Sequence, residues 1–308
     1  MKTLLKIVTR VMEGMGRRWE ARAGPVHQIP GDIDEFLDIP FIGSGGAPLF
    51  VDVFRPKEHS AEPLPVAIVM HGGGLVVGDR KLARRFSEIL ASKGFLVFAP
   101  EYRLAKETDG ISEIGDVYDG LSFVSEHLSE YGGGPDRVTV ITESAGTFVG
   151  LYAVASLGSQ TLRDTFGFGG PNLEVNSLVC FSGMFYTVRR DMIGIAYASS
   201  LYGDRRKDPS LKRLMDPECP EVMDNLPPMF LTSSDADFLK KYTIDYSEAL
   251  HKAGHPCEFL YYEGNKELTH AFPSLRTDLP ESREVMEKMI EWIGRIESSM
   301  QKRISSDE

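Results

Sequence analysis

The sequence predicts an α/β fold in which a mostly parallel central sheet is flanked by helices. Residues 66–70 and 95–99 are continuous apolar runs, as is typical of strands buried on both faces. Five β-branched residues in a row mark a third buried strand at residues 138–142. Helical patterns over residues 81–92 and 112–130 separate these strands. Strands that alternate with helices in this way usually build a parallel sheet.

Length and composition narrow the class of protein. The 308 residues suffice for one large domain or two ordinary ones. A formal net charge of −11 argues against a nucleic-acid partner and against binding to anionic membranes. Lys6 and Arg10 interrupt the apolar core that a signal peptide needs, and no stretch is long enough to span a membrane. Three cysteines lie far apart, without zinc-site spacing. We therefore expect a cytoplasmic protein.

The N-terminal segment differs from the rest of the chain. Residues 1 to about 23 have the pattern of an amphipathic helix, which ends at Gly24-Pro25. Such a helix packs on its own domain or lies on a membrane surface, and the lack of a dense basic run favours packing. Strand patterns follow around residues 33–41 and 49–54, and the glycines between them predict a hairpin.

The C-terminal half resumes the alternation after one interruption. Residues 184 to 228 are rich in aromatic and basic side chains and have no clear strand-helix rhythm. Long excursions of this kind serve as lids or binding segments, or they form surface helices. The expected strands are residues 175–181, 229–233 and 257–262, and the expected helices are residues 239–253 and the region around 285–293.

A serine lies at a strand-to-helix turn. Ser144 follows the strand at residues 138–142 and precedes an apolar helical run at 148–157. Acyl-transfer enzymes hold their nucleophile at such a turn, beside the first amides of a helix. A serine that only caps a helix would give the same local pattern, so distant segments must decide. Glu143 is either a group that supports this serine or a surface residue.

A serine nucleophile requires a histidine base and a carboxylate that orients it. Of the seven histidines, His270 lies in the loop after the last strand, at the sheet edge where functional loops gather. Asp235 and Asp237 both follow the strand at residues 229–233, and the pattern leaves the choice between them open. Glu267 and His270 also form a Glu-x-x-His, but one copy in a loop is weak evidence for a metal.

Backbone donors for an oxyanion are predicted at two loops. Attack on an acyl carbonyl creates a negative oxygen that needs two or three aimed amides. Gly73 and Gly74 follow the strand at residues 66–70, and glycine lets the backbone approach a substrate closely. Ala145 follows the serine at the start of the helical run. These three amides are the predicted oxyanion hole, and neither a metal nor an organic cofactor is implied.

Four motifs resemble those of the hormone-sensitive-lipase-like branch of the α/β-hydrolases. They are His-Gly-Gly-Gly at residues 71–74, Glu-Tyr-Arg-Leu-Ala at 101–105, Glu-Ser-Ala-Gly at 143–146 and His-Ala-Phe at 270–272. The resemblance runs from about residue 66 to 272. It implies the α/β-hydrolase fold with a helical cap, with Ser144 as nucleophile, His270 as base and Gly73, Gly74 and Ala145 as oxyanion hole, and it gives His71 a structural role.

The resemblance also selects the acid and divides the chain. In that family the acid precedes an apolar pair and a helix ending in Ala-Gly, a spacing kept by Asp237 and not by Asp235. The implied cap consists of residues 1–45, which include the first strand region, and of residues 184–228. Residues 46–183 and 229–308 form the two parts of one catalytic core. The aromatic and methionine residues of the cap would line a largely apolar acyl pocket.

Several residues depart from the family pattern. Thr142 stands where the first glycine of the usual Gly-x-Ser-x-Gly turn allows close approach of helix and strand, and Thr147 replaces a second glycine. Glu101 replaces an aspartate, and extra residues precede His270. These departures concern the substrate pocket and the helix contact more than the reaction.

The combined pattern predicts a serine carboxylesterase that cleaves short acyl esters through an acyl-enzyme. Ser144 would attack, His270 would take and return the proton, and Asp237 would orient the imidazole. One alternative is an amidase or a deacetylase of acylated sugars or drugs. Another is a non-catalytic small-molecule receptor on the same scaffold, which the plant gibberellin receptors resemble. The presence of the serine, the histidine and the aspartate argues against this receptor. The expected partner is a small acyl ester, and the sequence leaves open whether the chain forms a homo-oligomer.

Overall fold

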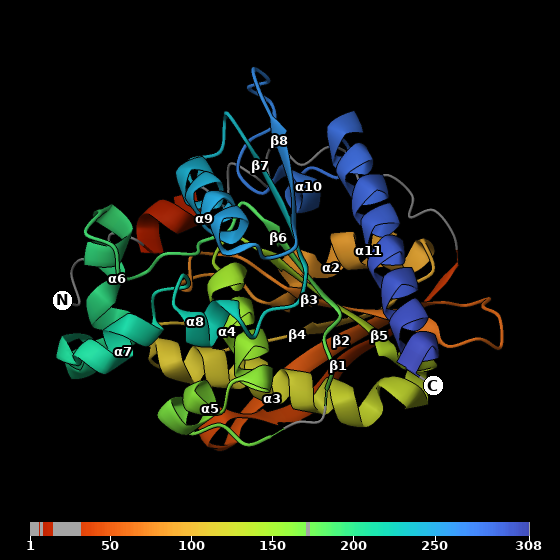
Figure 1. Ribbon diagram of the computed structural model, residues 1–308, viewed down its shortest axis with the longest axis horizontal. Helices are drawn as coiled ribbons and strands as arrows, with labels where there is room; N and C mark the ends of the chain where they lie inside the picture. The colour runs from red at the N-terminus through yellow and green to blue at the C-terminus, as the bar shows by residue number, and fades with distance from the viewer. Residues whose placement is uncertain (1–5, 7–8, 15–31, 171–172, 308) are drawn as a thin grey trace.

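The architecture is known from a computed structural model that describes residues 6, 9–14, 32–170 and 173–307 (Figure 1). Within these residues, eight strands form one sheet in the order β1-β2-β4-β3-β5-β6-β7-β8. The strands are β1 (Ile33–Gly43), β2 (Ala47–Pro56), β3 (Leu64–Met70), β4 (Leu96–Pro100), β5 (Gly133–Glu143), β6 (Ser177–Phe181), β7 (Met229–Ser234) and β8 (Cys257–Tyr262).

The sheet is mostly parallel, as predicted. β1 pairs with β2 and β2 with β4 in antiparallel fashion, and all other neighbours are parallel. The short 3-10 turn η1 (Ser44–Gly46) joins β1 to β2, which confirms the predicted hairpin. Met70 at the end of β3 is paired with Thr142 near the end of β5, so the loops that follow these two strands meet at one edge of the sheet.

Helices cover both faces of the sheet. The α-helices are α2 (Arg84–Ser92), α3 (Gly110–His127), α4 (Gly146–Gly158), α5 (Gln160–Phe166), α6 (Met192–Tyr202), α7 (Pro209–Leu214), α8 (Pro220–Met223), α9 (Lys240–Ala253), α10 (Phe272–Leu275) and α11 (Pro280–Asp307). The remaining 3-10 turns are η2 (Arg80–Ala83), η3 (Leu128–Tyr131) and η4 (Gly203–Lys207). The helix expected over residues 81–92 therefore starts as a 3-10 turn, and the one expected over 112–130 ends as one.

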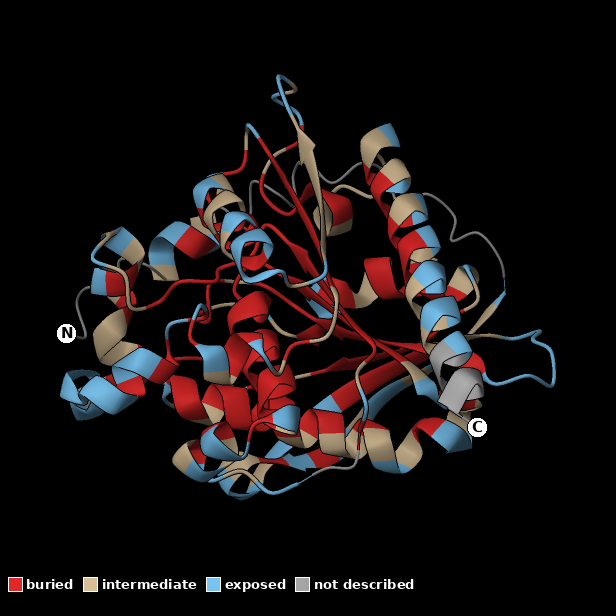
Figure 2. Cartoon of the chain, viewed as in Figure 1, coloured by how far each residue is buried: buried red, intermediate tan, exposed pale blue. Residues whose placement is uncertain are grey.

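The core lies on both sides of β3, which explains its uninterrupted apolar sequence. Val66, Ile68 and Met70 pack with residues of α3, α4 and α9 in one hydrophobic cluster. Ala67 and Val69 pack in a second cluster with residues of α2 and α11. Because side chains alternate across a strand, only a strand covered on both faces buries all of them. Figure 2 shows the central strands almost entirely buried and the outer helices buried on one side.

The segment 184–228 contains α6, η4, α7 and α8, and α6 and α7 lie together at one end of the molecule (Figure 1). Of the helix predicted over residues 1 to 23, residues 9–14 are helical, and most of the remainder lies outside the described residues. No helix in the described ranges has both the length and the apolar character needed to cross a bilayer.

Candidate active site

Ser144 occupies a constrained turn between β5 and α4. Its backbone has a φ of 50°, a left-handed conformation that is costly for a residue with a side chain. Two bonds to neighbouring segments hold it there: the Ser144 amide donates to the Phe181 carbonyl at 2.9 Å, and the Met184 amide donates to the Ser144 carbonyl at 2.8 Å. The turn therefore fixes the position of the serine hydroxyl at the carboxyl edge of the sheet.

Gly146, the first residue of α4, is required by close packing. A Cβ at this position would lie 2.5 Å from the carbonyl oxygen of His71 and 2.7 Å from that of Met70. Any side chain would push the helix away from β3. The glycine retained from the family motif therefore allows the helix that carries Ser144 to approach the central strands.

The departure at Thr142 has a structural compensation on the facing helix. Thr142 donates its hydroxyl to the Val179 carbonyl at 3.0 Å, and its Oγ1 lies 2.9 Å from Oγ1 of Thr147. The two threonines that replace family glycines thus bond to each other. A Cβ on Gly150 would lie 2.7 Å from the Thr142 Cγ2 methyl. Because Gly150 has no side chain, it leaves room for the Thr142 methyl. In the usual motif, a glycine at position 142 would leave this room instead.

This compensation gives a testable coupling. Alanine in a helix interior is normally more favourable than glycine by about 1 kcal/mol. In Gly150→Ala we expect the free energy of unfolding to fall instead, by about 1–3 kcal/mol, because the new methyl overlaps Thr142. Thr142→Ser removes the offending methyl and keeps the hydroxyl, so the same alanine should be neutral or stabilising in that background. Urea unfolding of the four proteins measures the coupling, and equal effects of alanine in both backgrounds would contradict it.

His270 connects Ser144 to a carboxylate. Its Nε2 lies 2.7 Å from Oγ of Ser144, and its Nδ1 lies 2.6 Å from Oδ1 of Asp237. The imidazole is only 2% exposed. The next residue, Ala271, has a φ of 52° and donates its amide to Oγ of Ser182, which itself has a φ of 53°. The loop after β8 is thereby held against the segment after β6.

Asp237 is built to remain charged. Its Oδ1 also accepts a hydrogen bond from the Leu239 amide at 2.9 Å, and its Oδ2 accepts one from the Ser233 hydroxyl at 2.7 Å. Burial alone would raise its pKa, but the bonds from His270, Ser233 and Leu239 stabilise the carboxylate and hold the pKa below the ordinary value. At neutral pH the residue is therefore an anion facing the imidazole.

Asp235, the other carboxylate considered from the sequence, has different partners. It is exposed and accepts hydrogen bonds from the Tyr261 hydroxyl and the Gly264 amide, both at 2.8 Å. It ties the end of β7 to the turn after β8, as a loop cap does. The bond to His270 Nδ1 distinguishes Asp237 from it.

Gly73 and Gly74 lie in the loop after β3, next to the serine turn. A Cβ on the preceding Gly72 would lie 3.1 Å from Cβ of Ser144, which shows how close the two segments are. Gly73 has a φ of 111°, and a Cβ there would overlap the Val77 carbonyl oxygen at 1.9 Å, so only glycine fits. Ala145 lies at the N-terminus of α4, where backbone amides point out of the helix.

Glu143 is buried, so the surface role considered from the sequence is wrong. Its Oε1 accepts a hydrogen bond from the Gly72 amide at 3.0 Å, and its Oε2 accepts one from the Ser274 hydroxyl. Burial raises the pKa of this carboxyl. Glu143 thus joins the glycine loop to the segment that follows His270.

His71 is buried and bonds to the backbone of the glycine loop. Its ring stacks on Tyr102 with centroids 4.3 Å apart, and its Nδ1 donates to the Gly72 carbonyl at 2.7 Å. Burial lowers the pKa of His71 to about 4, so the ring is neutral at physiological pH. The Tyr102 hydroxyl in turn donates to the His71 carbonyl at 2.8 Å.

Tyr197 is a site residue whose role was missed in the sequence. Tyr197 lies on α6, and its hydroxyl donates to the Gly74 carbonyl at 2.6 Å. This hydrogen bond is buried. Met12 lies on the same glycine: a Cβ on Gly74 would come within 3.1 Å of its Cε. In the sequence this tyrosine is one of several aromatics in the 184–228 segment, and no local signal sets it apart.

A metal site is not assembled around His270. Among the described residues, no group of three or more His, Cys, Asp or Glu side chains is arranged to hold a metal ion. Both ring nitrogens of His270 already face Ser144 and Asp237.

A buried serine, histidine and aspartate at the carboxyl edge of a mostly parallel sheet, beside a glycine loop, are the features of the α/β-hydrolase class. The chain belongs to the alpha/beta hydrolase fold family, whose model matches residues 67–274. Among curated proteins it is 30% identical to the carboxylic ester hydrolase LipN of Mycobacterium tuberculosis, an alignment covering 83% of this chain and 68% of LipN.

Other relatives are more distant. The chain is 24% identical to a probable isoprenylcysteine α-carbonyl methylesterase of Arabidopsis thaliana over 70% of its own length, but it spans only about half of that protein. Among solved structures, esterase B of Lactobacillus rhamnosis superposes with a TM-score of 0.88 at 22% identity, covering 100% of this chain and 99% of that one. Brefeldin A esterase, described as a bacterial homologue of human hormone-sensitive lipase, gives a TM-score of 0.70 at 19% identity over 96% and 85% of the two chains. Both superpositions show the same fold as this chain.

Proposed function

We propose that the protein is a serine carboxylesterase that hydrolyses short-chain acyl esters through an acyl-enzyme. The observation that carries this proposal is the hydrogen-bonded chain from Ser144 through His270 to Asp237. The carboxylic ester hydrolase LipN, related over most of this chain, supports the same class of reaction. Short esters are proposed because Ser144 is only 6% exposed, which favours a small acyl group over a bulky one.

In the proposed reaction, His270 Nε2 takes the proton of the Ser144 hydroxyl as Oγ attacks the ester carbonyl. The amides of Gly73, Gly74 and Ala145 would bind the oxyanion of the tetrahedral intermediate. His270 then protonates the leaving alcohol, and the acyl group remains on Ser144. Water attacks this acyl-enzyme with His270 again as base, which releases the carboxylic acid and restores the serine.

The proposal includes a cap built from residues 1–45 and 184–228. Support comes from Gly74, on which Met12 of the first segment and Tyr197 of the second both pack. The two segments therefore meet above the glycine loop, where the acyl group of a substrate would lie. The core parts, residues 46–183 and 229–308, contribute Ser144, Asp237 and His270.

Replacing the nucleophile tests the proposed function. In Ser144→Ala we expect kcat on p-nitrophenyl butyrate to fall on the order of 10⁴-fold or more, with loss of the initial burst. Ser156→Ala is the matched control, because this buried serine of α4 donates only to the Tyr152 carbonyl of its own helix. A serine-directed phosphonate should label Ser144, as read by mass spectrometry. Wild-type protein that binds esters without turning them over would contradict the esterase and favour a receptor.

Tyr197 offers a subtler test, because its hydroxyl holds the carbonyl of Gly74, the residue whose amide is proposed to help bind the oxyanion. In Tyr197→Phe we expect kcat to fall by about three- to tenfold with little change in KM, as follows from losing one hydrogen bond worth about 1 kcal/mol. Tyr202→Phe is the control, since this buried tyrosine of the same helix bonds to Thr187 instead. Equal kinetics of the two variants would refute a positioning role for Tyr197.

A further inference from the structure

A cavity lies in the 184–228 segment, and Ser144 is not among the residues that line it. It has a volume of about 320 Å³ and lies between the loop at residues 188–190, α6, η4 and α7. This volume is within the range typical of small-molecule sites. Its floor is apolar, and Tyr202, Leu211 and Met215 on it are buried. Ile195 and Ala198 add apolar surface at the mouth. We call this cavity the cap pocket.

The rim of the cap pocket is strongly cationic. None of the described residues that line it has an acidic side chain. The cations that line it are Arg189, Arg190, Arg205, Arg206, Lys207 and Lys212. Such a concentration is unexpected in a chain whose formal net charge is −11. Like charges held this close repel one another, and a bound anion would relieve that repulsion.

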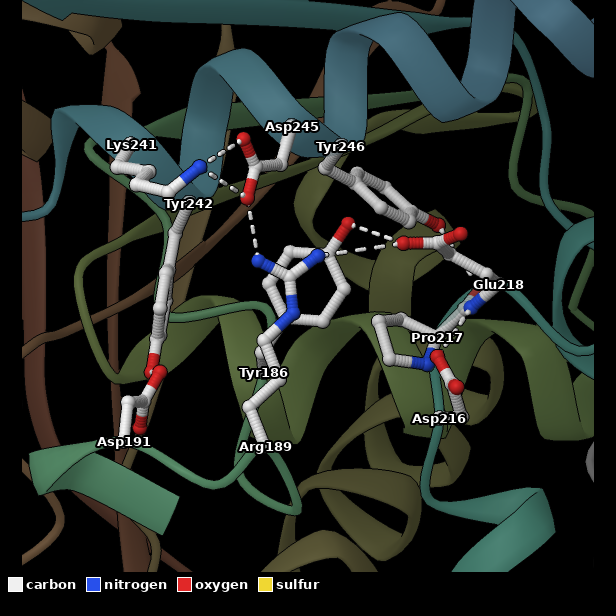
Figure 3. A network of polar contacts seen from close by, with 10 residues as sticks. All are labelled: Tyr186, Arg189, Asp191, Asp216, Pro217, Glu218, Lys241, Tyr242, Asp245 and Tyr246. Carbon is white, nitrogen blue, oxygen red and sulfur yellow. Dashed lines mark hydrogen bonds and ion pairs between the residues drawn. The ribbon is translucent and has the colours of Figure 1, made fainter.

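Within the described ranges, Arg189 is the one rim cation that is paired with protein carboxylates. It pairs with Asp245 of α9 and with Glu218, and its guanidinium stacks over the Tyr186 ring (Figure 3). The Tyr242 hydroxyl bonds to Asp191 in the same network. These contacts fix one wall of the cap pocket to the core helix α9. The acids of this network do not pair with the other cations of the rim.

The other rim cations have no carboxylate partner within the part of the chain that is described. Arg205 donates to the Thr165 carbonyl at 3.4 Å and Arg206 to the Gly203 carbonyl at 2.9 Å, both neutral acceptors. The carboxylate of nearby Asp208 accepts the Ser210 amide and does not line the cavity. By contrast, Arg213 on the neighbouring surface is paired with Glu221.

We propose that the cap pocket binds a single-chain anionic amphiphile. Its aliphatic chain would occupy the apolar floor, and its carboxylate or phosphate would be held by Arg190, Arg205 and their neighbours, which suit these groups by charge and planar geometry. A purely apolar ligand would not pair with the cations of the rim, and a small inorganic anion would leave the apolar floor in contact with water. The same chemistry is offered by a free amphiphile and by a lipid that presents a phosphate headgroup.

Calorimetric titration of the full-length protein with decyl phosphate tests the proposal. We expect saturable binding at one site beside any binding near Ser144, and affinities for decanol and for inorganic phosphate weaker by about tenfold or more, since each lacks half of the recognised chemistry. Vesicles of phosphatidylcholine with and without lysophosphatidate form the second arm. Binding of decyl phosphate in solution indicates a free ligand, and binding of the vesicles alone indicates a lipid-borne one.

Three variants test whether the binding occurs in the cap pocket. Arg190→Glu combined with Lys207→Glu should weaken it by about tenfold or more by placing repulsive charges on the rim. Lys93→Glu combined with Lys252→Glu changes the net charge equally at exposed positions outside the cavity and should leave it unchanged. Ala198→Phe should fill the mouth and block binding while every cation remains. Binding to neither ligand source, or undiminished binding in the rim variant, would overturn the proposal whatever the outcome for ester hydrolysis.

Discussion

Asp237→Asn should lower kcat by about 10⁴-fold with little loss of stability, because it changes which nitrogen of His270 carries the proton. The carboxylate accepts bonds from His270, Leu239 and Ser233. An amide in its place carries no charge, and where it turns its NH₂ toward the imidazole, Nδ1 must accept and the bond from the Leu239 amide is lost. Nε2 would carry the proton toward Ser144 and could no longer remove the hydroxyl hydrogen. Single-turnover and steady-state kinetics on p-nitrophenyl butyrate measure the effect.

Asp235→Asn is the matched control. This aspartate follows the same strand, but it is exposed and serves Tyr261 and Gly264. We expect kcat to change by less than about threefold, as for an ordinary surface substitution. A large loss in Asp235→Asn together with an active Asp237→Asn would mean that another loop arrangement operates during turnover and would contradict the proposed site.

Removal of Arg80 should have the largest effect on stability. Arg80 is 5% exposed and contacts three carboxylates: its Nε lies 2.9 Å from Asp52, one terminal nitrogen lies 2.8 Å from Glu101, and the other bonds to Asp38. In Arg80→Met, Asp52 would remain buried without its counter-charge. Breaking one side of a buried ion pair costs about 3–5 kcal/mol, and we expect the free energy of unfolding to fall by that amount.

Urea unfolding with two independent probes measures this loss and tests that the transition remains two-state. The control is Arg295→Met, which breaks an exposed pair with Glu258 and should cost less than about 1 kcal/mol. If both variants lost the same small amount, the buried cluster would contribute no more than a surface pair. Glu101 belongs to this cluster, so the glutamate that departs from the family motif still holds the loop region after β3.

The sequence predicted those features that depend on local pattern and chain order. The apolar runs at residues 66–70 and 95–99 marked buried strands because both faces of β3 and β4 are covered. His270 could be singled out because it follows the last strand, and parallel strands present their following loops at one edge. The choice between Asp235 and Asp237 required the resemblance, since two aspartates two positions apart differ only in where their loop directs them.

Contacts between segments far apart in the chain could not be predicted from the sequence. Nothing near Tyr197 indicates that its hydroxyl meets Gly74, 123 residues earlier. Thr142 looked like a defect in the serine turn because its compensating Gly150 lies in the second turn of the next helix, where a glycine is usually only a weak helix former. Glu143 could be read as a surface residue for the same reason: its partners come from the loops after β3 and His270.

The left-handed backbone at Ser144, Ser182 and Ala271 limits how this site could be transplanted. A single such residue costs of order 1 kcal/mol and persists only where its surroundings hold it. Here each is restrained by bonds to a different part of the chain. A designer who grafted the three loops onto another scaffold would copy the residues and lose the restraints, and the loops would relax into ordinary conformations. The geometry of the site depends on the complete domain, so we expect it to be kept only when the whole domain is transferred.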